Sequence, residues 1–241
     1  MLTKEEYKSI NEKFIKNSNK QNAIKVFSLI IMMVILLALI FLLLYFVFDF
    51  FSITLLIIVV LVCAIFTYLP SVILIFNWKI NKYLIQDELE KALHYSKLFS
   101  KLTFNLFKEA AIATDICIHF AMNDEKFFEG NIYKISPNSL ALVDTYFYQS
   151  LYNLKHKNFK EAIDKCNLLS LDIEQNEPHC IQYDALLEAF KYAKTNEKTD
   201  KLVNYQEVFN DAYFNNVIDV ISTYTIQDNE ELKNSGELNI I

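Results

Sequence analysis

The chain has 241 residues, of which 53% are hydrophobic and 15% aromatic, and its formal net charge is −6. With only 2 Gly and 3 Pro, it has too few turn residues for a β-barrel or β-sandwich and the wrong composition for a collagen-like or low-complexity chain. The apolar residues are concentrated between Val26 and Phe76, a block whose only charged residue is Asp49, which excludes an ordinary soluble domain.

The charge is distributed unevenly along the chain. Residues 1–25 carry 6 Lys and 3 acidic residues, whereas residues 79–241 carry 17 Lys and 25 acidic residues. All 23 basic residues are lysines. Because binding to a phosphate backbone relies on clustered basic charge, the acidic C-terminal part argues against nucleic-acid binding.

Residues 1–23 form a basic segment with the periodicity of an amphipathic helix. Tyr7, Ile10 and Phe14 fall on one face of a helix predicted over residues 3–20. Two interpretations remain open: the segment lies on anionic lipid through its lysines, or it packs on the C-terminal domain or frays. A cleaved signal peptide is disfavoured, because its apolar region spans about 7–15 residues and ends at a small-residue cleavage site.

Residues 24–77 predict a transmembrane helical hairpin. One crossing of about 30 Å of hydrocarbon needs about 20 residues, so the apolar block is long enough for two crossings. We expect one helix over about 24–48 and a second over about 52–77, with Asp49 in the turn and Ser52 as an N-cap. Pro70 lies within the second helix, where its ring and missing N–H can bend the axis.

Lysines flank this hairpin on one side only. Six precede the first helix and end at Lys25, others follow the second helix, and the turn contains none. The positive-inside rule then predicts a two-pass protein of the cell membrane with both termini in the cytoplasm. The expected aromatic and basic anchors at the inner membrane interface are Trp78, Lys79, Lys82 and Lys25.

Residues 78–226 have helical periodicity almost throughout and predict an all-α cytoplasmic domain, either a bundle or an array of helical hairpins. N-cap signals at Ser136, Asn158 and Asn176, two of them followed by proline, mark helix starts. The residues from 227 to 241 are expected to be a flexible acidic tail. We expect helices over about 78–98, 101–122, 137–155, 159–171, 178–195 and 200–225.

Part of this domain carries a pattern of aromatic residue, small residue, short turn with alanine, and closing proline. These features are Tyr146, Ser150, Asn158–Ile163 and Pro178. The stretch, about residues 143–178, resembles a tetratricopeptide-like helical-hairpin repeat, although Asn153 and Cys166 stand at positions that are usually aromatic. The resemblance implies stacked hairpins that build a concave peptide-binding surface.

Aromatic residues are concentrated over residues 127–159. Because Tyr and Phe side chains are strong anchors at protein interfaces, four of them are candidate partner-binding residues. Packing in the core of a helical domain is the alternative interpretation. The four candidates are Tyr146, Tyr148, Tyr152 and Phe159.

Motifs for cofactor, metal or catalytic chemistry are missing from the sequence. The cysteines have no C-x-x-C spacing, no P-loop, G-x-S-x-G or H-E-x-x-H occurs, and we expect no cofactor, no metal and no enzymatic activity. His94 follows Glu90 by four residues and His119 follows Asp115 by four, whereas di-iron bundles use Glu-x-x-His. The four cysteines, which we expect to be buried small apolar residues, are Cys63, Cys117, Cys166 and Cys180.

The sequence therefore predicts a membrane-anchored adaptor or scaffold that presents an α-helical protein-binding domain at the cytoplasmic face. The expected partners are the lipid bilayer and a protein. The alternative is a small integral-membrane immunity or accessory factor that acts through its hairpin on a toxin or transporter. A third class, an enzyme at the membrane surface, rests only on the two carboxylate–histidine pairs.

Overall fold

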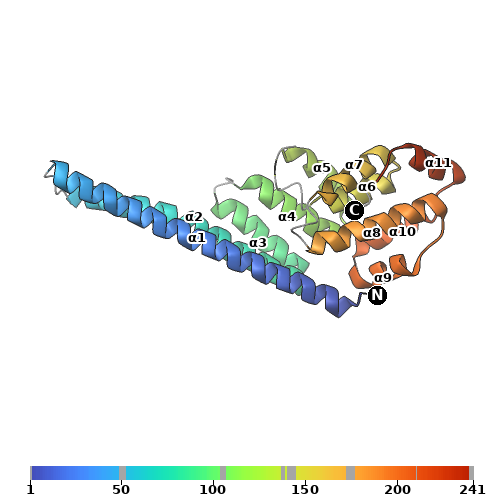
Figure 1. Ribbon diagram of the computed structural model, residues 1–241, viewed down its shortest axis with the longest axis horizontal. Helices are drawn as coiled ribbons and strands as arrows, with labels where there is room; N and C mark the ends of the chain where they lie inside the picture. Colours follow the sequence, from blue (N-terminus) through green and yellow to red (C-terminus); the bar gives the residue numbers. More distant parts are fainter. Residues whose placement is uncertain are drawn as a thin grey trace.

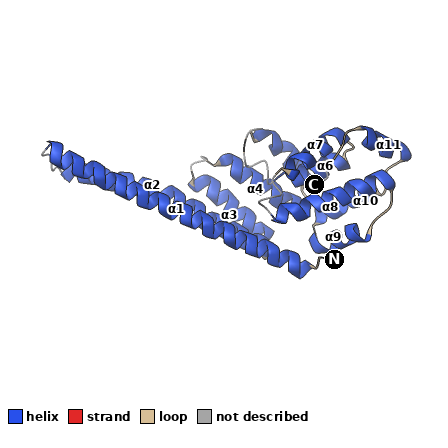
Figure 2. Cartoon of the chain, viewed as in Figure 1, coloured by secondary structure: helices blue, strands red, loops and turns tan. Residues whose placement is uncertain are grey.

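The computed structural model describes residues 2–48, 53–103, 107–136, 139, 145–171, 177–209 and 211–238. Helices are the regular structure throughout these residues, with no strand among them (Figure 2), which confirms the all-α fold. The molecule consists of a long pair of helices and a group of shorter helices gathered at one end of that pair (Figure 1).

The long pair is formed by α1 (Lys4–Phe48) and α2 (Ile53–Ile85), which pack side by side and run in opposite directions (Figure 1). The segment predicted as a separate helix over residues 3–20 is continuous with the apolar helix, because no Gly or Pro interrupts residues 20–25. At 45 residues, α1 is about 68 Å long. The predicted turn residues Asp49 and Ser52 lie outside the described residues.

Much of α1 has an apolar surface that no other element covers. Among the residues that the structure describes, it is the one helix long and apolar enough to cross a membrane, over Lys4–Ile40, and none of its most apolar window is buried. Phe27, Met32 and Leu39 are 66%, 63% and 59% exposed. The prediction of two crossings stays a prediction, since most side chains in the first half of α2 lie outside the described set.

The shorter helices follow the pair in chain order. They are α3 (Leu89–Leu102), α4 (Lys108–Ala121), α5 (Glu125–Asn131), a 3-10 turn η1 (Ile132–Lys134), α6 (Tyr146–Lys155), α7 (Phe159–Ser170), α8 (Glu177–Thr195), α9 (Asp200–Phe209), α10 (Ala212–Ile221) and α11 (Ile226–Asn234). Three predicted helices are divided. The one over 78–98 is split between the end of α2 at Ile85 and the start of α3 at Leu89. The one over 101–122 is interrupted after Leu102, where the Thr103 hydroxyl donates to the carbonyl of Phe99 at 2.8 Å, and the one over 200–225 is α9 and α10.

Four of the turns between helices share one backbone geometry. Each contains a non-glycine residue in the left-handed region, and successive examples are 36, 34 and 39 residues apart. At the first three, the next amide donates to the carbonyl five residues back, at 2.8–2.9 Å, as in a Schellman motif. The domain is therefore built from repeated helix–turn–helix units. The four left-handed residues are Asp87, Asn123, Lys157 and Asn196.

Helix α10 packs against the first helix of three successive hairpins, namely α4, α6 and α8. Its apolar face is buried: the Tyr213 ring lies 4.4 Å from that of Phe120, and the Phe214 ring lies 6.1 Å from that of Phe147. Val217 and Ile218 complete the face one turn further on. The inner side of the hairpin array is thus filled by the chain's own helix.

A second, smaller apolar cluster joins the long pair to the helical domain. It combines Val72 and Ile80 of α2 with Phe99 of α3 and Ala111 of α4. The ring of Phe76 lies 6.3 Å from that of Phe99, so α2, α3 and α4 are packed as one continuous layer. The helical domain therefore packs directly against α2 of the long pair.

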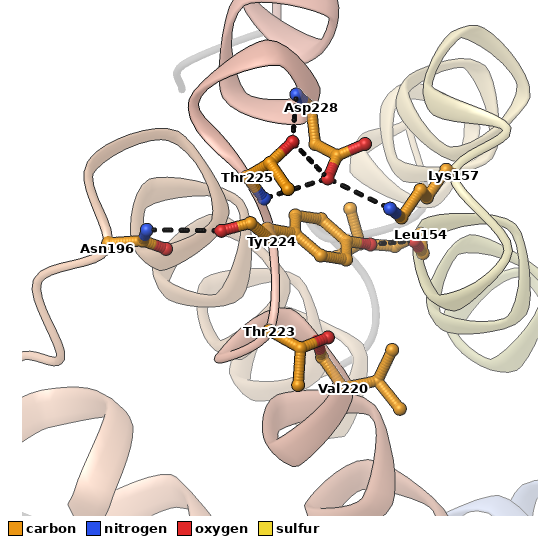
Figure 3. Close-up of polar contacts among 8 residues, drawn as sticks. All are labelled: Leu154, Lys157, Asn196, Val220, Thr223, Tyr224, Thr225 and Asp228. Carbon is orange, nitrogen blue, oxygen red and sulfur yellow. Dashed lines mark hydrogen bonds and ion pairs between the residues drawn. The ribbon is translucent and has the colours of Figure 1, made fainter.

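The segment predicted to be a flexible tail contains α11, which packs on α7 and α8 and buries Leu232 completely (Figure 1). This is a correction, and its cause is visible in Figure 3: Thr225 and Asp228 form a capping box at the start of α11. The Lys157 ammonium lies 2.9 Å from Asp228 and ties this end to the α6–α7 turn. Polar residues thus begin a helix in a segment that would be predicted to be disordered from its composition alone.

The preceding residue, Tyr224, is fixed from both sides (Figure 3). Its hydroxyl donates to the carbonyl of Leu154, and its own carbonyl accepts a hydrogen bond from the Asn196 amide at 3.4 Å. The α10–α11 connection is therefore bound to two of the left-handed turns, those at Lys157 and Asn196.

Replacing Asp228 with asparagine is expected to destabilise the full chain by about 1 kcal/mol, since solvent screens part of the interaction with Lys157. The hydrogen bonds from Lys157 and then Thr225 lower the pKa of Asp228 to about 2. A lowered carboxyl pKa contributes stability that is present above the unfolded-state value and is lost as pH falls. The difference between wild type and D228N should therefore be constant above about pH 4 and shrink towards pH 2.

Thermal unfolding of the detergent-solubilised chain, followed by circular dichroism across this pH range, measures the effect. Glu230→Gln is the matched control, because Glu230 is an exposed acid on the same helix. An equal loss in E230Q, or a D228N difference that does not change with pH, would contradict this account of the α11 cap.

Candidate functional site

The N-terminal end of α1 is docked on the helical domain rather than free. The Tyr7 ring lies 5.1 Å from the ring of Phe209 at the end of α9. Asn204 makes two hydrogen bonds to Leu2, receiving its amide at 3.1 Å and donating to its carbonyl at 2.8 Å. Burial raises the pKa of Tyr7. Of the two interpretations left open for residues 1–23, packing on the domain describes this end of the chain.

Tyr7→Ala is expected to remove about 2 kcal/mol of docking energy, because it deletes the aromatic contact with Phe209. Tryptic cleavage after Lys8 and Lys13 in the membrane-bound chain should then accelerate at least about tenfold, as local opening becomes more frequent. Glu5→Ala, at an exposed position of the same helix, is the control and should leave the rate unchanged. Equal cleavage rates for wild type and Y7A would show that the segment is not docked.

A half-buried polar pair lies next to the contact between α1 and the domain. The Tyr148 hydroxyl donates to Asp211 Oδ2 at 3.1 Å, and Asp211 Oδ1 accepts the backbone amides of Tyr213 and Phe214 at 2.8 and 3.0 Å. Burial raises the pKa of Asp211, and these hydrogen bonds oppose the rise. Burial also raises the pKa of Tyr148, beside the Asp211 carboxyl. Asp211 is thus the N-cap of α10, and Tyr148 holds it in place.

The candidate partner-binding aromatics are therefore divided by the structure. Phe159 is 2% exposed, which makes it a core residue unavailable to a partner. Tyr148 stacks on Phe120 at 4.9 Å in addition to binding Asp211. Tyr146 and Tyr152 are half-buried and keep one side accessible, and the Tyr152 hydroxyl donates to Glu129 at 2.8 Å.

The predicted membrane anchors lie on the two long helices, next to the domain. Trp78 is 54% exposed, and the Lys82 ammonium lies 5.7 Å from its ring. Lys79 turns the other way and lies 4.6 Å from the ring of Tyr95 on α3. Lys25 is exposed on α1. Trp78, Lys82 and Lys25 remain available to a membrane interface, whereas Lys79 contacts the domain.

The cysteines and histidines are dispersed. Cys166 is buried, which raises the pKa of its thiol to about 12, but Cys180 is exposed, which corrects the prediction that it is a core residue. His119 pairs with Asp124 at 3.1 Å, not with the Asp115 of the sequence pair. Among the described residues, no three His, Cys, Asp or Glu side chains are placed to hold a metal ion.

Of the residues at the contact between α1 and the domain and in the adjacent polar pair, the sequence singled out Tyr7, on its apolar face, and Tyr148, as a candidate partner-binding residue. Asp211 precedes an apolar run and carries an N-cap signal that is readable in retrospect. Its partner Tyr148 is 63 residues away, a distance over which periodicity has no information.

No family model, curated protein or solved structure matches the chain. Its function is therefore argued from its own geometry and charge.

Proposed function

We propose that the protein is a membrane-anchored adaptor or scaffold, with a two-pass hairpin that holds the helical domain at the cytoplasmic face of the cell membrane. The observation that carries this proposal is the division of α1. Its apolar part is uncovered, while its N-terminal end docks on α8 and α9 within the same uninterrupted helix. One continuous helix thus contains both an apolar segment that can span the membrane and a segment that binds the domain. This arrangement fits a protein whose domain must be held at the bilayer.

Two features support a second crossing by α2. The helix returns alongside α1 for 33 residues, and described side chains on it, including Ile58 and Leu61, are exposed and apolar. Charge supports the orientation: lysines cluster at the domain end of both helices and are absent from residues 48–52. Exposed Trp78 and Lys82 then lie at the inner interface.

The partner proposed for the domain is a protein. Repeated hairpins with left-handed turns 34–39 residues apart support the likeness to tetratricopeptide-like arrays, whose period is about 34 residues. Because α10 fills the inner side of the array, we place the partner on the outer surface, where Tyr146 and Tyr152 stay accessible. The excess of acidic residues over lysines after residue 78 suits a partner with a basic surface.

The test replaces residues 26–67, which keeps the contacts of Val72 and Phe76 with the domain, with an unrelated two-helix anchor. Protein co-purification in detergent is then compared with that of the native chain. Retention of the same partner by the swapped chain supports an adaptor whose domain is the binding module. If the swapped chain no longer retains the partner that the native chain binds, the result favours the immunity or accessory factor that acts through its spans. Y146A/Y152A should weaken retention, and absence of any partner from both chains would overturn the adaptor proposal.

A further inference from the structure

The long helices line an open basic groove on the domain side of the apolar region. Its cavity measures about 650 Å³. Four lysines and a single acid line it, together with the chain's only tryptophan. The charged and aromatic lining residues are Lys8, Glu12, Lys16, Lys20, Trp78 and Lys82.

An apolar groove continues directly from the basic one along the same helices. This second cavity measures about 490 Å³ and shares Lys20 with the first. Its other lining includes Ile24, Phe27 and Ile30 of α1 and Leu74 of α2. A cationic groove therefore adjoins an apolar one. A phospholipid has the matching arrangement, with an anionic headgroup joined to apolar acyl chains.

The lysines of the basic groove have no ion-pair partner within the part of the chain that the structure describes. They are Lys8, Lys16, Lys20 and Lys82. Lys82 instead lies 5.7 Å from the ring of Trp78. Like charges four residues apart on one helix face, such as Lys16 and Lys20, repel each other, and a bound anion would remove that cost.

We propose that this groove binds one anionic phospholipid. Its phosphate lies among Lys16, Lys20 and Lys82, Trp78 borders the headgroup, and an acyl chain follows the apolar cavity. From Lys20 to Ile30 the helix rises about 15 Å, half of the roughly 30 Å hydrocarbon thickness, which matches one leaflet. The inference rests on the proposed membrane insertion and adds to it a defined site, beyond diffuse attraction of lysines to the surface.

Trp78 is a built-in reporter, since no other tryptophan contributes fluorescence. The full chain is placed in phosphatidylcholine nanodiscs that contain a small fraction of phosphatidylglycerol, brominated near the carboxyl end of one acyl chain. We expect this lipid to quench Trp78 at least about fivefold more effectively than equally brominated phosphatidylcholine at the same fraction.

Two double variants distinguish a defined lipid site from non-specific attraction between lysines and anionic lipid. Lys16→Gln with Lys20→Gln should abolish the preference, whereas Lys4→Gln with Lys13→Gln, which removes two exposed lysines of α1 outside the groove, should retain it. Equal losses in both doubles, or no preference for phosphatidylglycerol in the native chain, would overturn the proposal. Reversal of the quenching by excess soluble glycerol phosphate would overturn it too, by indicating a free-phosphate site.

Failure of membrane insertion gives a different result. If neither brominated lipid quenches Trp78 at all, the long helices are not in the bilayer, and both the lipid site and the proposed function are overturned. Quenching by both lipids without preference overturns the lipid site alone.

Discussion

Phe214→Ala is expected to destabilise the full chain by about 4 kcal/mol, the largest effect of any single change considered. The Phe214 side chain is fully buried at the start of α10, with the rings of Phe209 and Phe147 at 5.3 and 6.1 Å. Alanine would remove these contacts and leave a cavity that close-packed helices on several sides cannot collapse to fill. Thermal unfolding in detergent, followed by the helical circular dichroism signal, measures the loss.

Asp219→Ala provides the matched control on the same helix. Asp219 is exposed, so its replacement should change the free energy of unfolding by less than about 0.5 kcal/mol. A small effect of F214A, comparable to that of D219A, would show that α10 does not fill the inner side of the hairpins. The partner would then have a free concave surface, and its placement on the outer surface would be wrong.

The second large effect concerns membrane insertion. Replacing both Ile35 and Leu39 with lysine is expected to raise the free energy of insertion by about 6 kcal/mol, because each lysine near a helix centre costs about 3 kcal/mol. Both side chains are exposed and lie one turn apart on α1. The double variant should leave the membrane pellet and appear in the soluble or aggregated fraction after alkaline carbonate extraction.

Val203→Lys with Ile226→Lys is the control for that experiment. It places two lysines at exposed apolar positions of the helical domain, so the change in composition is similar but the position is different. This chain should stay in the pellet like wild type. Carbonate-resistant I35K/L39K would mean that the exposed apolar side of α1 is covered by something other than lipid.

Two helix starts were predictable from residue types that favour helix starts, although the Asn158 side chain makes no capping hydrogen bond. Asn158 precedes α7, which begins at Phe159, and the proline signal at Pro178 lies within one residue of the start of α8 at Glu177. Such residue preferences, including the fixed φ of proline, act over a few residues, so the sequence displays them directly.

The turn at Asp87 was missed because it lies inside the helix predicted over 78–98 and its left-handed residue is not a glycine. The turns at Asn123, Lys157 and Asn196 fall between predicted helices. With 2 Gly in the chain, all four turns use residue types that are also common in helices and loops. The division after Leu102 was likewise missed, because no Gly or Pro lies between Leu102 and Lys108.

The basic groove was predictable only in part, because it combines residues that are far apart in the sequence. Trp78 and Lys82 follow an apolar block and fit the interfacial pattern directly. Their association with Lys16 and Lys20 depends on how α1 and α2 pack, which charge and periodicity do not reveal. The burial of Phe159 beneath Tyr224, at 5.8 Å between rings, likewise requires a contact 65 residues apart in the chain.

The central claim, a two-pass anchor with a cytoplasmic domain, is tested most directly by labelling with a membrane-impermeant maleimide. Cys180 is exposed on the domain, and Asp49→Cys adds a thiol at the predicted outer turn. In sealed right-side-out vesicles, we predict that D49C is labelled from outside while Cys180 reacts only after detergent is added. Labelling of Cys180 in intact vesicles, or a D49C thiol that reacts only after lysis, would contradict the account.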